Sequence, residues 1–172
     1  EAPGAQAKML HAKANRPNLF IKIPGTPEGF LAIEAATFAG VPVNVTLLFS
    51  TEQYSAAADA YLNGLERRVA AGLSPDVRSV ASLFISRWDV AVAQKVSNEL
   101  LNTLGIAVSK QSYKAYRDLL GSDRFQSLAS RVPRPPGLLF ARPRPTVPTA
   151  SRTRYSTPPS PPKTPTTHPR AP

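Results

Sequence analysis

A lysine lies inside an apolar segment, where a charged side chain is uncommon. Lys22 is flanked by Ile21 and Ile23. Because side chains alternate across a β-strand, the two isoleucines share one face and Lys22 takes the other. A lysine in a confined site gives up its proton more readily, and the neutral amine attacks carbonyl carbons to form a Schiff base. The segment therefore suggests a nucleophilic lysine. A lysine on an edge strand, or one paired with an acid, would be the purely structural alternative.

The residues that follow Lys22 indicate its place in the fold. Pro24-Gly25-Thr26-Pro27 has the composition of a tight turn, with Thr26 as a helix N-cap and Pro27 at the first helical position. The lysine would thus lie near the carboxyl end of a strand that leads into a helix. Barrels of alternating strands and helices keep their catalytic groups at that position.

Two later apolar runs, 41–49 and 80–85, carry polar or aromatic residues in register. One face of these runs holds Asn44, Thr46, Ser82 and Phe84. The opposite face holds Val43, Val45, Leu47, Leu83 and Ile85. In a doubly wound sheet both faces meet helices and are normally apolar. The inner face of a barrel, near its mouth, accommodates polar groups that meet a ligand. The pattern therefore favours part of a barrel, with Lys22 on the same inner face.

Each apolar run is followed by a segment with helical features. The sequence predicts helices over 27–38, 51–71, 88–104, 109–120 and 123–129. Gly40, Gly72 and Gly105 would end the first three helices, and Ser50 and Gln53 form a capping-box pattern before the second. Alternating strands and helices with short connections predict a parallel sheet and an α/β fold. Three strands, or four with residues 138–140, are too few to close an eight-stranded barrel.

Composition divides the chain at about residue 130. Residues 1–130 hold 13 Lys or Arg and all 11 Asp and Glu, so this part is nearly neutral. Residues 131–172 hold 8 Lys or Arg, no acid and 13 of the 19 prolines. Such a segment buries too little apolar surface to offset its ordering entropy, so we expect a disordered tail with polyproline II character. The net charge of +10 thus belongs mostly to the tail, and it is not the footprint of a nucleic-acid-binding domain.

Several chemistries are disfavoured by the residues present. The chain has no cysteine, which excludes disulfides and thiolate chemistry, and His11 and His168 lie too far apart in sequence to suggest metal ligation. We therefore expect no metal and no other cofactor. No apolar stretch approaches the roughly 20 residues needed to cross a bilayer, and the first residues lack a signal-peptide pattern. The expectation is a cytoplasmic protein with no membrane or nucleic-acid partner.

Three blocks of this sequence resemble the transaldolase family. They are Asn18-Leu-Phe-Ile-Lys-Ile-Pro-Gly-Thr-Pro-Glu-Gly29, Gly40-Val-Pro-Val-Asn-Val-Thr-Leu-Leu-Phe-Ser50 and Val80-Ala-Ser-Leu-Phe-Ile-Ser-Arg87. The first is most similar to the type whose lysine strand reads Ile-Lys-Ile-Pro-Gly-Thr, a form also found fused to phosphoglucose isomerase. The resemblance implies that residues 1–130 form part of an (α/β)8 TIM barrel, from about the fourth strand to the sixth. The alternative is that the segment also includes the seventh strand.

The resemblance also implies an activity and roles for particular residues. Transaldolases transfer a dihydroxyacetone unit between sugar phosphates in the pentose phosphate pathway, without a cofactor. Their substrates are fructose 6-phosphate, sedoheptulose 7-phosphate, erythrose 4-phosphate and glyceraldehyde 3-phosphate. The matching catalytic positions are Lys22, for the Schiff base, and Thr46, for the water used in proton transfer. The matching substrate-binding positions are Asn44, Ser82, Phe84 and Arg87, with the arginine on the sugar phosphate.

Two departures from the family qualify this expectation. The family uses an aspartate on the first strand and a glutamate on the third, and this chain begins just before the position of the fourth. The isolated segment is therefore expected to be inactive. The abrupt change after Arg131 further suggests that residues 131–172 are the seventh-strand region read in a shifted frame, with a genuine disordered extension as the alternative.

Two other functions remain open from the sequence. One is a lysine-dependent aldolase that cleaves a sugar phosphate without transfer. The other is a non-catalytic protein that binds through its basic, proline-rich tail, in which Pro158-Pro-Ser-Pro-Pro-Lys163 supplies Pro-x-x-P spacing beside a cation.

Overall fold

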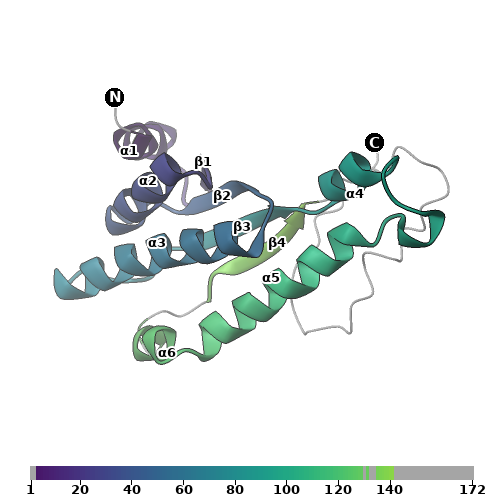
Figure 1. Ribbon diagram of the computed structural model, residues 1–172. Helices are drawn as coiled ribbons and strands as arrows, with labels where there is room; N and C mark the ends of the chain where they lie inside the picture. The colour runs from purple at the N-terminus through teal and green to yellow at the C-terminus, as the bar shows by residue number, and fades with distance from the viewer. Residues whose placement is uncertain (1–2, 130, 132–134, 142–172) are drawn as a thin grey trace.

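The computed structural model describes residues 3–129, 131 and 135–141 of the 172-residue chain. Helices and strands alternate through this part. They are α1 (Pro3–Ala14), β1 (Ile21–Pro24), α2 (Pro27–Phe38), β2 (Val43–Leu48), α3 (Thr51–Ala70), β3 (Ser79–Phe84), α4 (Ser86–Val92), the 3-10 helix η1 (Asn98–Leu100), α5 (Leu104–Gly121), α6 (Asp123–Ala129) and β4 (Gly137–Ala141). The four strands form one parallel sheet in the order β1-β2-β3-β4 (Figure 1).

Local signals in the sequence set the boundaries of α2 and α3. The Thr26 hydroxyl accepts a hydrogen bond from the Gly29 N–H at 3.2 Å, and the Ser50 hydroxyl accepts one from the Gln53 N–H at 3.2 Å. Each bond satisfies a backbone donor that the first helical turn leaves unpaired. Gly40 follows α2 with a φ of +81°, a conformation that glycine adopts without steric cost. The predicted limits of α2 are therefore confirmed, and those of α3 are confirmed to within one residue.

The apolar core lies between the sheet and the helices on one of its faces. Helices α2, α3 and α5 lie side by side across this face, as Figure 1 shows. The strands contribute the buried side chains of Ile23, Val43, Val45, Leu48, Leu83 and Leu138. The helices contribute Ile33, Ala36, Tyr54, Tyr61, Leu62 and Leu65. Each large side chain buried here stabilises the fold by about 1.5–3 kcal/mol relative to an exposed one.

The order of the strands and the one-sided helices identify the architecture. Each strand pairs with the next one along the chain, and helices connect them, as in a singly wound barrel rather than a doubly wound sheet. The second face of the sheet then corresponds to the inside of a barrel. The prediction of a partial (α/β)8 barrel is confirmed, and the strand predicted at residues 138–140 is present as β4, parallel to β3.

The single helix predicted over 88–104 is wrong. Helix α4 ends at Val92, η1 follows, and α5 begins at Leu104. The Asp89 carboxylate accepts a hydrogen bond from the Gly105 N–H at 2.9 Å, so the start of α5 folds back against α4. Gly105 therefore lies in the first turn of α5 instead of ending a helix. Leu100, which belongs to the predicted apolar face, is exposed, so the apolar spacing does not mark a face that is buried throughout.

The predicted alternation along β2 fails at one residue. Leu47 was expected beside Val43 and Val45, but it is exposed and has a φ of +58°. The register of β2 against β3 shifts between Val45 and Leu48, and Leu48 is buried instead. An irregularity of this kind adds a residue and turns the following side chain to the other face.

The predicted boundary at residue 130 also changes. β4 lies within the segment predicted as a tail, and it extends the sheet to Ala141. The remainder of that segment, residues 142–172, lies outside the described residues, so its predicted disorder and shifted frame stay predictions.

Candidate functional site

Strand register brings the predicted site residues to one face of the sheet. Lys22 is the partner of Asn44 across β1 and β2, and Pro24 is the partner of Thr46. Asn44 is in turn the partner of Val80 on β3, so Ser82, two residues later, lies on the same face. This is the face opposite α2, α3 and α5. The expected convergence of the three strands is therefore observed.

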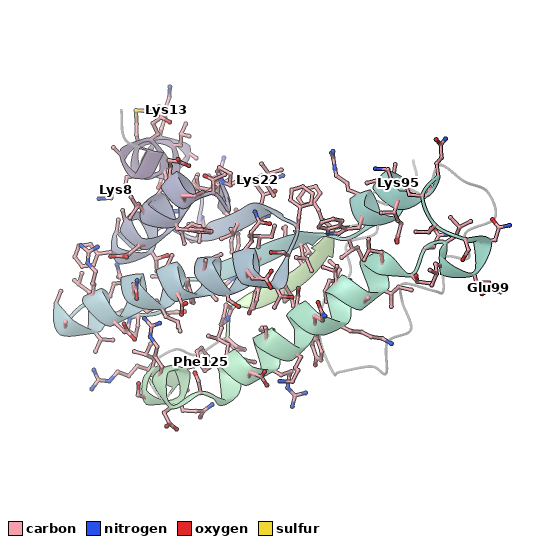
Figure 2. All side chains as sticks on the ribbon, in the orientation of Figure 1. Lys8, Lys13, Lys22, Lys95, Glu99 and Phe125 are labelled. Atoms are coloured by element: carbon pink, nitrogen blue, oxygen red, sulfur yellow. The ribbon has the colours of Figure 1, made fainter. Side chains whose placement is uncertain are left out.

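Lys22 lies at the edge of this arrangement. Its side chain is exposed, and within the described residues it forms no ion pair. Figure 2 labels Lys22 at β1, on the side of the sheet away from Phe125 of α6. Because β1 is an edge strand of the described sheet, the alternative of a lysine on an edge strand is met here. The alternative of a lysine paired with a neighbouring acid is not seen among the described residues. In a closed barrel the same ammonium group would lie inside the mouth, shielded from bulk water.

Asn44 and Ser82 are joined across the sheet. The Ser82 hydroxyl donates a hydrogen bond to Oδ1 of Asn44 at 2.8 Å. With Oδ1 turned toward Ser82, the NH₂ group of Asn44 points away from that residue. Nδ2 of Asn44 has no acceptor among the described residues. The amide can therefore donate to an oxygen of a ligand on the open face.

Thr46 is buried on the same face, and its hydroxyl is unpaired. The residue is 7% exposed, and Oγ1 has no hydrogen-bond partner among the described residues. A buried hydroxyl without a partner costs about 1–3 kcal/mol unless a water or ligand satisfies it. Leu47, next along the chain, has a positive φ, and backbone strain of this kind clusters at functional sites. The position suits a residue that holds a water molecule.

Phe84 and Arg87 lie where β3 leads into α4. The Arg87 guanidinium carbon lies 5.7 Å from the centre of the Phe84 ring, within the range of a cation–π contact. The Phe84 ring lies 5.6 Å from that of Phe49, which follows β2. Arg87 is exposed, and it forms no ion pair within the described residues. Its charge is therefore available to an anionic ligand.

Arg87 and Asp89 are two residues apart in α4, but no ion pair joins them in the described part of the chain. Asp89 is buried, and its carboxylate accepts the hydrogen bond from the Gly105 N–H described above. A buried carboxylate at the start of α5 also meets the positive end of the helix dipole. Asp89 thus connects α4 to α5 and does not bind the Arg87 guanidinium.

Two residues of the site were not predicted as part of it. Gln53 was predicted only as a capping residue, yet its Oε1 accepts the Phe49 N–H at 2.8 Å and its Nε2 donates to the Gly25 carbonyl at 3.4 Å. Trp88 was predicted only as part of a helical face, yet its Nε1–H donates to the Phe49 carbonyl at 2.7 Å. The capping-box pattern was a partial signal for Gln53, whereas nothing in the sequence pointed to the partner of Trp88.

No metal site is evident in the described residues. Within 3–129, 131 and 135–141, no three His, Cys, Asp or Glu side chains gather closely enough to hold a metal ion. None of the helices in this part of the chain is both long and apolar enough to span a bilayer.

Comparison with known proteins agrees with the geometry. Residues 1–154 match the family model described as transaldolase/fructose-6-phosphate aldolase. A transaldolase of Thiobacillus denitrificans is 43% identical over 144 residues, which is 79% of this chain and 40% of the relative. A transaldolase of Saccharopolyspora erythraea is 41% identical over 157 residues, or 88% of this chain and 43% of the relative. A transaldolase of Thermobifida fusca is 41% identical over 145 residues, or 80% of this chain and 39% of the relative.

The chain spans about two fifths of the length of these curated relatives. The family match covers all four strands and continues beyond β4. The chain belongs to the transaldolase/fructose-6-phosphate aldolase family.

Proposed function

We propose that this chain carries the Schiff-base part of a transaldolase active site. The activity would transfer a dihydroxyacetone unit from fructose 6-phosphate or sedoheptulose 7-phosphate to an aldose phosphate, in the pentose phosphate pathway of the cytoplasm. One observation carries the proposal. Lys22 is in register with Asn44, which is hydrogen-bonded to Ser82, so a nucleophile and an amide donor share one face of adjacent strands.

The chemistry follows from an amine at Lys22. Nζ attacks the C2 carbonyl of fructose 6-phosphate, and loss of water gives an iminium ion. The iminium withdraws electrons, so the C3–C4 bond breaks, glyceraldehyde 3-phosphate leaves and a stabilised carbanion remains on C3. The carbanion adds to the aldehyde carbon of erythrose 4-phosphate, and hydrolysis of the new iminium releases sedoheptulose 7-phosphate and free Lys22.

The other site residues have complementary roles. Asn44 would donate to an oxygen of the dihydroxyacetone unit, and Ser82 and Phe84 would line the pocket beside it. Thr46 would hold the water that relays protons, and its unpaired hydroxyl supports this role. Arg87 would bind the sugar phosphate, for which its forked donors are suited. The family's two proton-transferring carboxylates belong to earlier strands, so we propose that this segment alone is inactive.

The experiment uses a chimera in which residues 1–141 replace the matching part of the Thiobacillus denitrificans transaldolase. Consumption of fructose 6-phosphate is measured with and without erythrose 4-phosphate. The proposal expects consumption that depends on the acceptor and yields sedoheptulose 7-phosphate. Release of dihydroxyacetone at the same rate without an acceptor would instead establish the aldolase activity that the family description also names.

A further inference from the structure

Trp88 is the single tryptophan of the chain and directly follows Arg87 in the first turn of α4. Its indole N–H donates to the Phe49 carbonyl at 2.7 Å, which joins α4 to the end of β2. Helix α4 is only 7 residues long, and its N-cap residue, Ile85, provides no side-chain hydrogen bond. The indole bond ties this first turn to the residue that follows β2. The bond therefore limits how far the turn that carries Arg87 can move.

Phe49, which accepts the indole hydrogen bond, is itself held in place by two contacts. Its N–H is bound by the Gln53 side chain at 2.8 Å, and its ring packs on Phe84. The Phe84 ring in turn meets the Arg87 guanidinium. The backbone of Phe49 thus holds Trp88, while its ring supports the aromatic surface on which Arg87 rests. The backbone contact with Trp88 and the ring contact with Phe84 therefore both influence the position of the Arg87 guanidinium group.

We propose that Trp88 is a positioning residue for Arg87 and thereby sets the preference of the site for phosphorylated over unphosphorylated sugars. The inference rests on the proposed function, in which Arg87 binds the phosphate. Loss of the indole N–H would leave the charge of Arg87 intact but release the turn that carries it. A forked donor loses much of its advantage when its orientation is not fixed. In the proposed function the sugar end of the ligand would contact Lys22, Asn44 and Ser82 on β1, β2 and β3, so its binding would not change.

The test compares binding of fructose 6-phosphate with binding of fructose by NMR titration of the ¹⁵N-labelled 172-residue chain. Trp88→Phe keeps an aromatic ring but removes the N–H donor. It should weaken binding of fructose 6-phosphate about fivefold, the usual effect of losing one hydrogen bond, and leave fructose unaffected. Tyr61→Phe is the matched control, because it removes a 2.7 Å bond from a side chain to the Val77 carbonyl, away from the site. Circular dichroism establishes that all variants fold.

Arg87→Gln separates this inference from the proposed function. If wild type binds both sugars alike, or if Arg87→Gln keeps the preference for the phosphorylated sugar, the phosphate role of Arg87 is wrong and the inference is overturned with it. If Arg87→Gln abolishes the preference but Trp88→Phe retains it, only the inference is overturned. Equal weakening of both sugars by Trp88→Phe, or the same effect from Tyr61→Phe, would also overturn it.

Discussion

At the scale of single residues, the Asn44 side chain is the best-defined element of the site. Its Oδ1 accepts the Ser82 hydroxyl, so its NH₂ group is directed to other partners on the open face. A ketose presents hydroxyl and carbonyl oxygens, and all of these can accept from an amide. Ser82 would thus affect ligand binding indirectly, by orienting the Asn44 amide.

Ser82→Ala tests this orientation. Removal of the hydroxyl should raise the KM of the chimera for fructose 6-phosphate about threefold to tenfold, since an unrestrained amide forms weaker hydrogen bonds to the sugar. Ser79→Ala is the control, because Ser79 lies on the same strand but is the partner of Val43, on the face that meets the helices. Steady-state kinetics measure both variants. Equal KM values for Ser82→Ala and the parent chimera would show that the hydrogen bond does not orient the amide.

The face of each site residue could be predicted from the sequence, but its partners could not. Alternation alone placed Lys22, Asn44 and Ser82 together, because parallel strands in register align the same faces. The bond from Trp88 to Phe49 joins residues 39 positions apart. It depends on how α4 leaves β3, and no local pattern encodes that geometry. The bulge at Leu47 could not be predicted for another reason. Leu47 and Leu48 are equally apolar, so the sequence does not show which of them is buried.

At the scale of elements, the turn between β1 and α2 depends on two glycines. A Cβ at Gly29 would lie 1.8 Å from the Pro24 carbonyl oxygen, and a Cβ at Gly25 would lie 2.3 Å from a Leu48 methyl group. The first obstacle is backbone and cannot rotate away. Gly29 also donates the capping bond to Thr26, so α2 starts directly against the strand that carries Lys22.

Gly29→Ala should therefore destabilise the chain by about 2–3 kcal/mol, as expected for an added carbon in a closely packed position. Gly121→Ala is the control, because a Cβ at the end of α5 would meet nothing within 4 Å. That change should be neutral or stabilise by up to about 1 kcal/mol through helix propensity. Urea denaturation followed by circular dichroism measures both. A free energy of unfolding for Gly29→Ala equal to that of wild type would contradict the described packing.

The elements also show where sequence patterns are insufficient. Helices α2 and α3 carried their limits in caps and glycines, and those predictions are confirmed. The helix predicted over 123–129 is confirmed as α6. The helix predicted over 88–104 had apolar residues at helical spacing but no cap of its own. The Asp89 side chain, which belongs to α4, accepts a hydrogen bond from the Gly105 N–H in the first turn of α5. Gly105 therefore lies inside α5. Long-range capping of this kind leaves no trace in local spacing.

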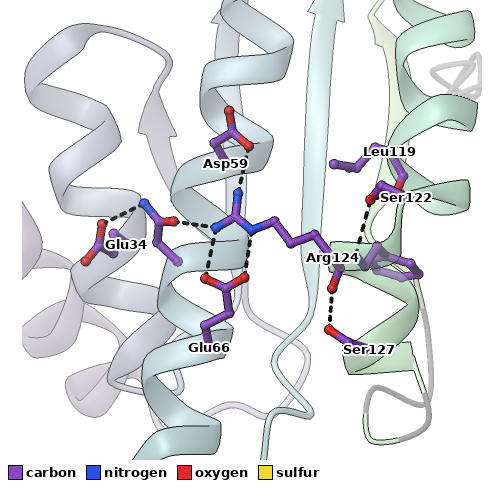
Figure 3. A network of polar contacts seen from close by, with 9 residues as sticks. Glu34, Asp59, Glu66, Leu119, Ser122, Arg124 and Ser127 are labelled. Carbon is purple, nitrogen blue, oxygen red and sulfur yellow. Dashed lines mark hydrogen bonds and ion pairs between the residues drawn. The ribbon is translucent and has the colours of Figure 1, made fainter.

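At the scale of the whole molecule, Arg124 joins helix α6 to helix α3. Its guanidinium binds Glu66 through two bonds of 2.7 and 2.9 Å and Asp59 through one of 3.0 Å (Figure 3). It also donates to Asn63, so its contacts extend over about two turns of α3. Helix α6 leads to β4, and this cluster therefore helps to bring the fourth strand to the sheet. The hydrogen bond from Arg124 holds the pKa of Glu66 below its ordinary value.

Arg124→Met should lower the free energy of unfolding by about 1 kcal/mol near neutral pH, a modest value because the partners are half exposed. A carboxylate with a depressed pKa stabilises the fold above its unfolded pKa, and this contribution is lost as the pH falls through the folded pKa. The difference between wild type and variant should therefore be present above the ordinary pKa of 4.5 and shrink as the pH falls below it. Urea denaturation across this pH range measures it. A difference that grows in acid would contradict the role of Glu66.

Lys22 is the residue on which the proposed activity depends. The most direct measurement is borohydride reduction of the Thiobacillus denitrificans chimera in the presence of fructose 6-phosphate, followed by mass spectrometry of its peptides. We expect the mass of a reduced dihydroxyacetone unit on the peptide that contains Lys22, and no added mass anywhere in Lys22→Met. Labelling that persists in Lys22→Met, or that falls on another lysine of the wild-type chimera, would contradict the assignment of the Schiff base to Lys22.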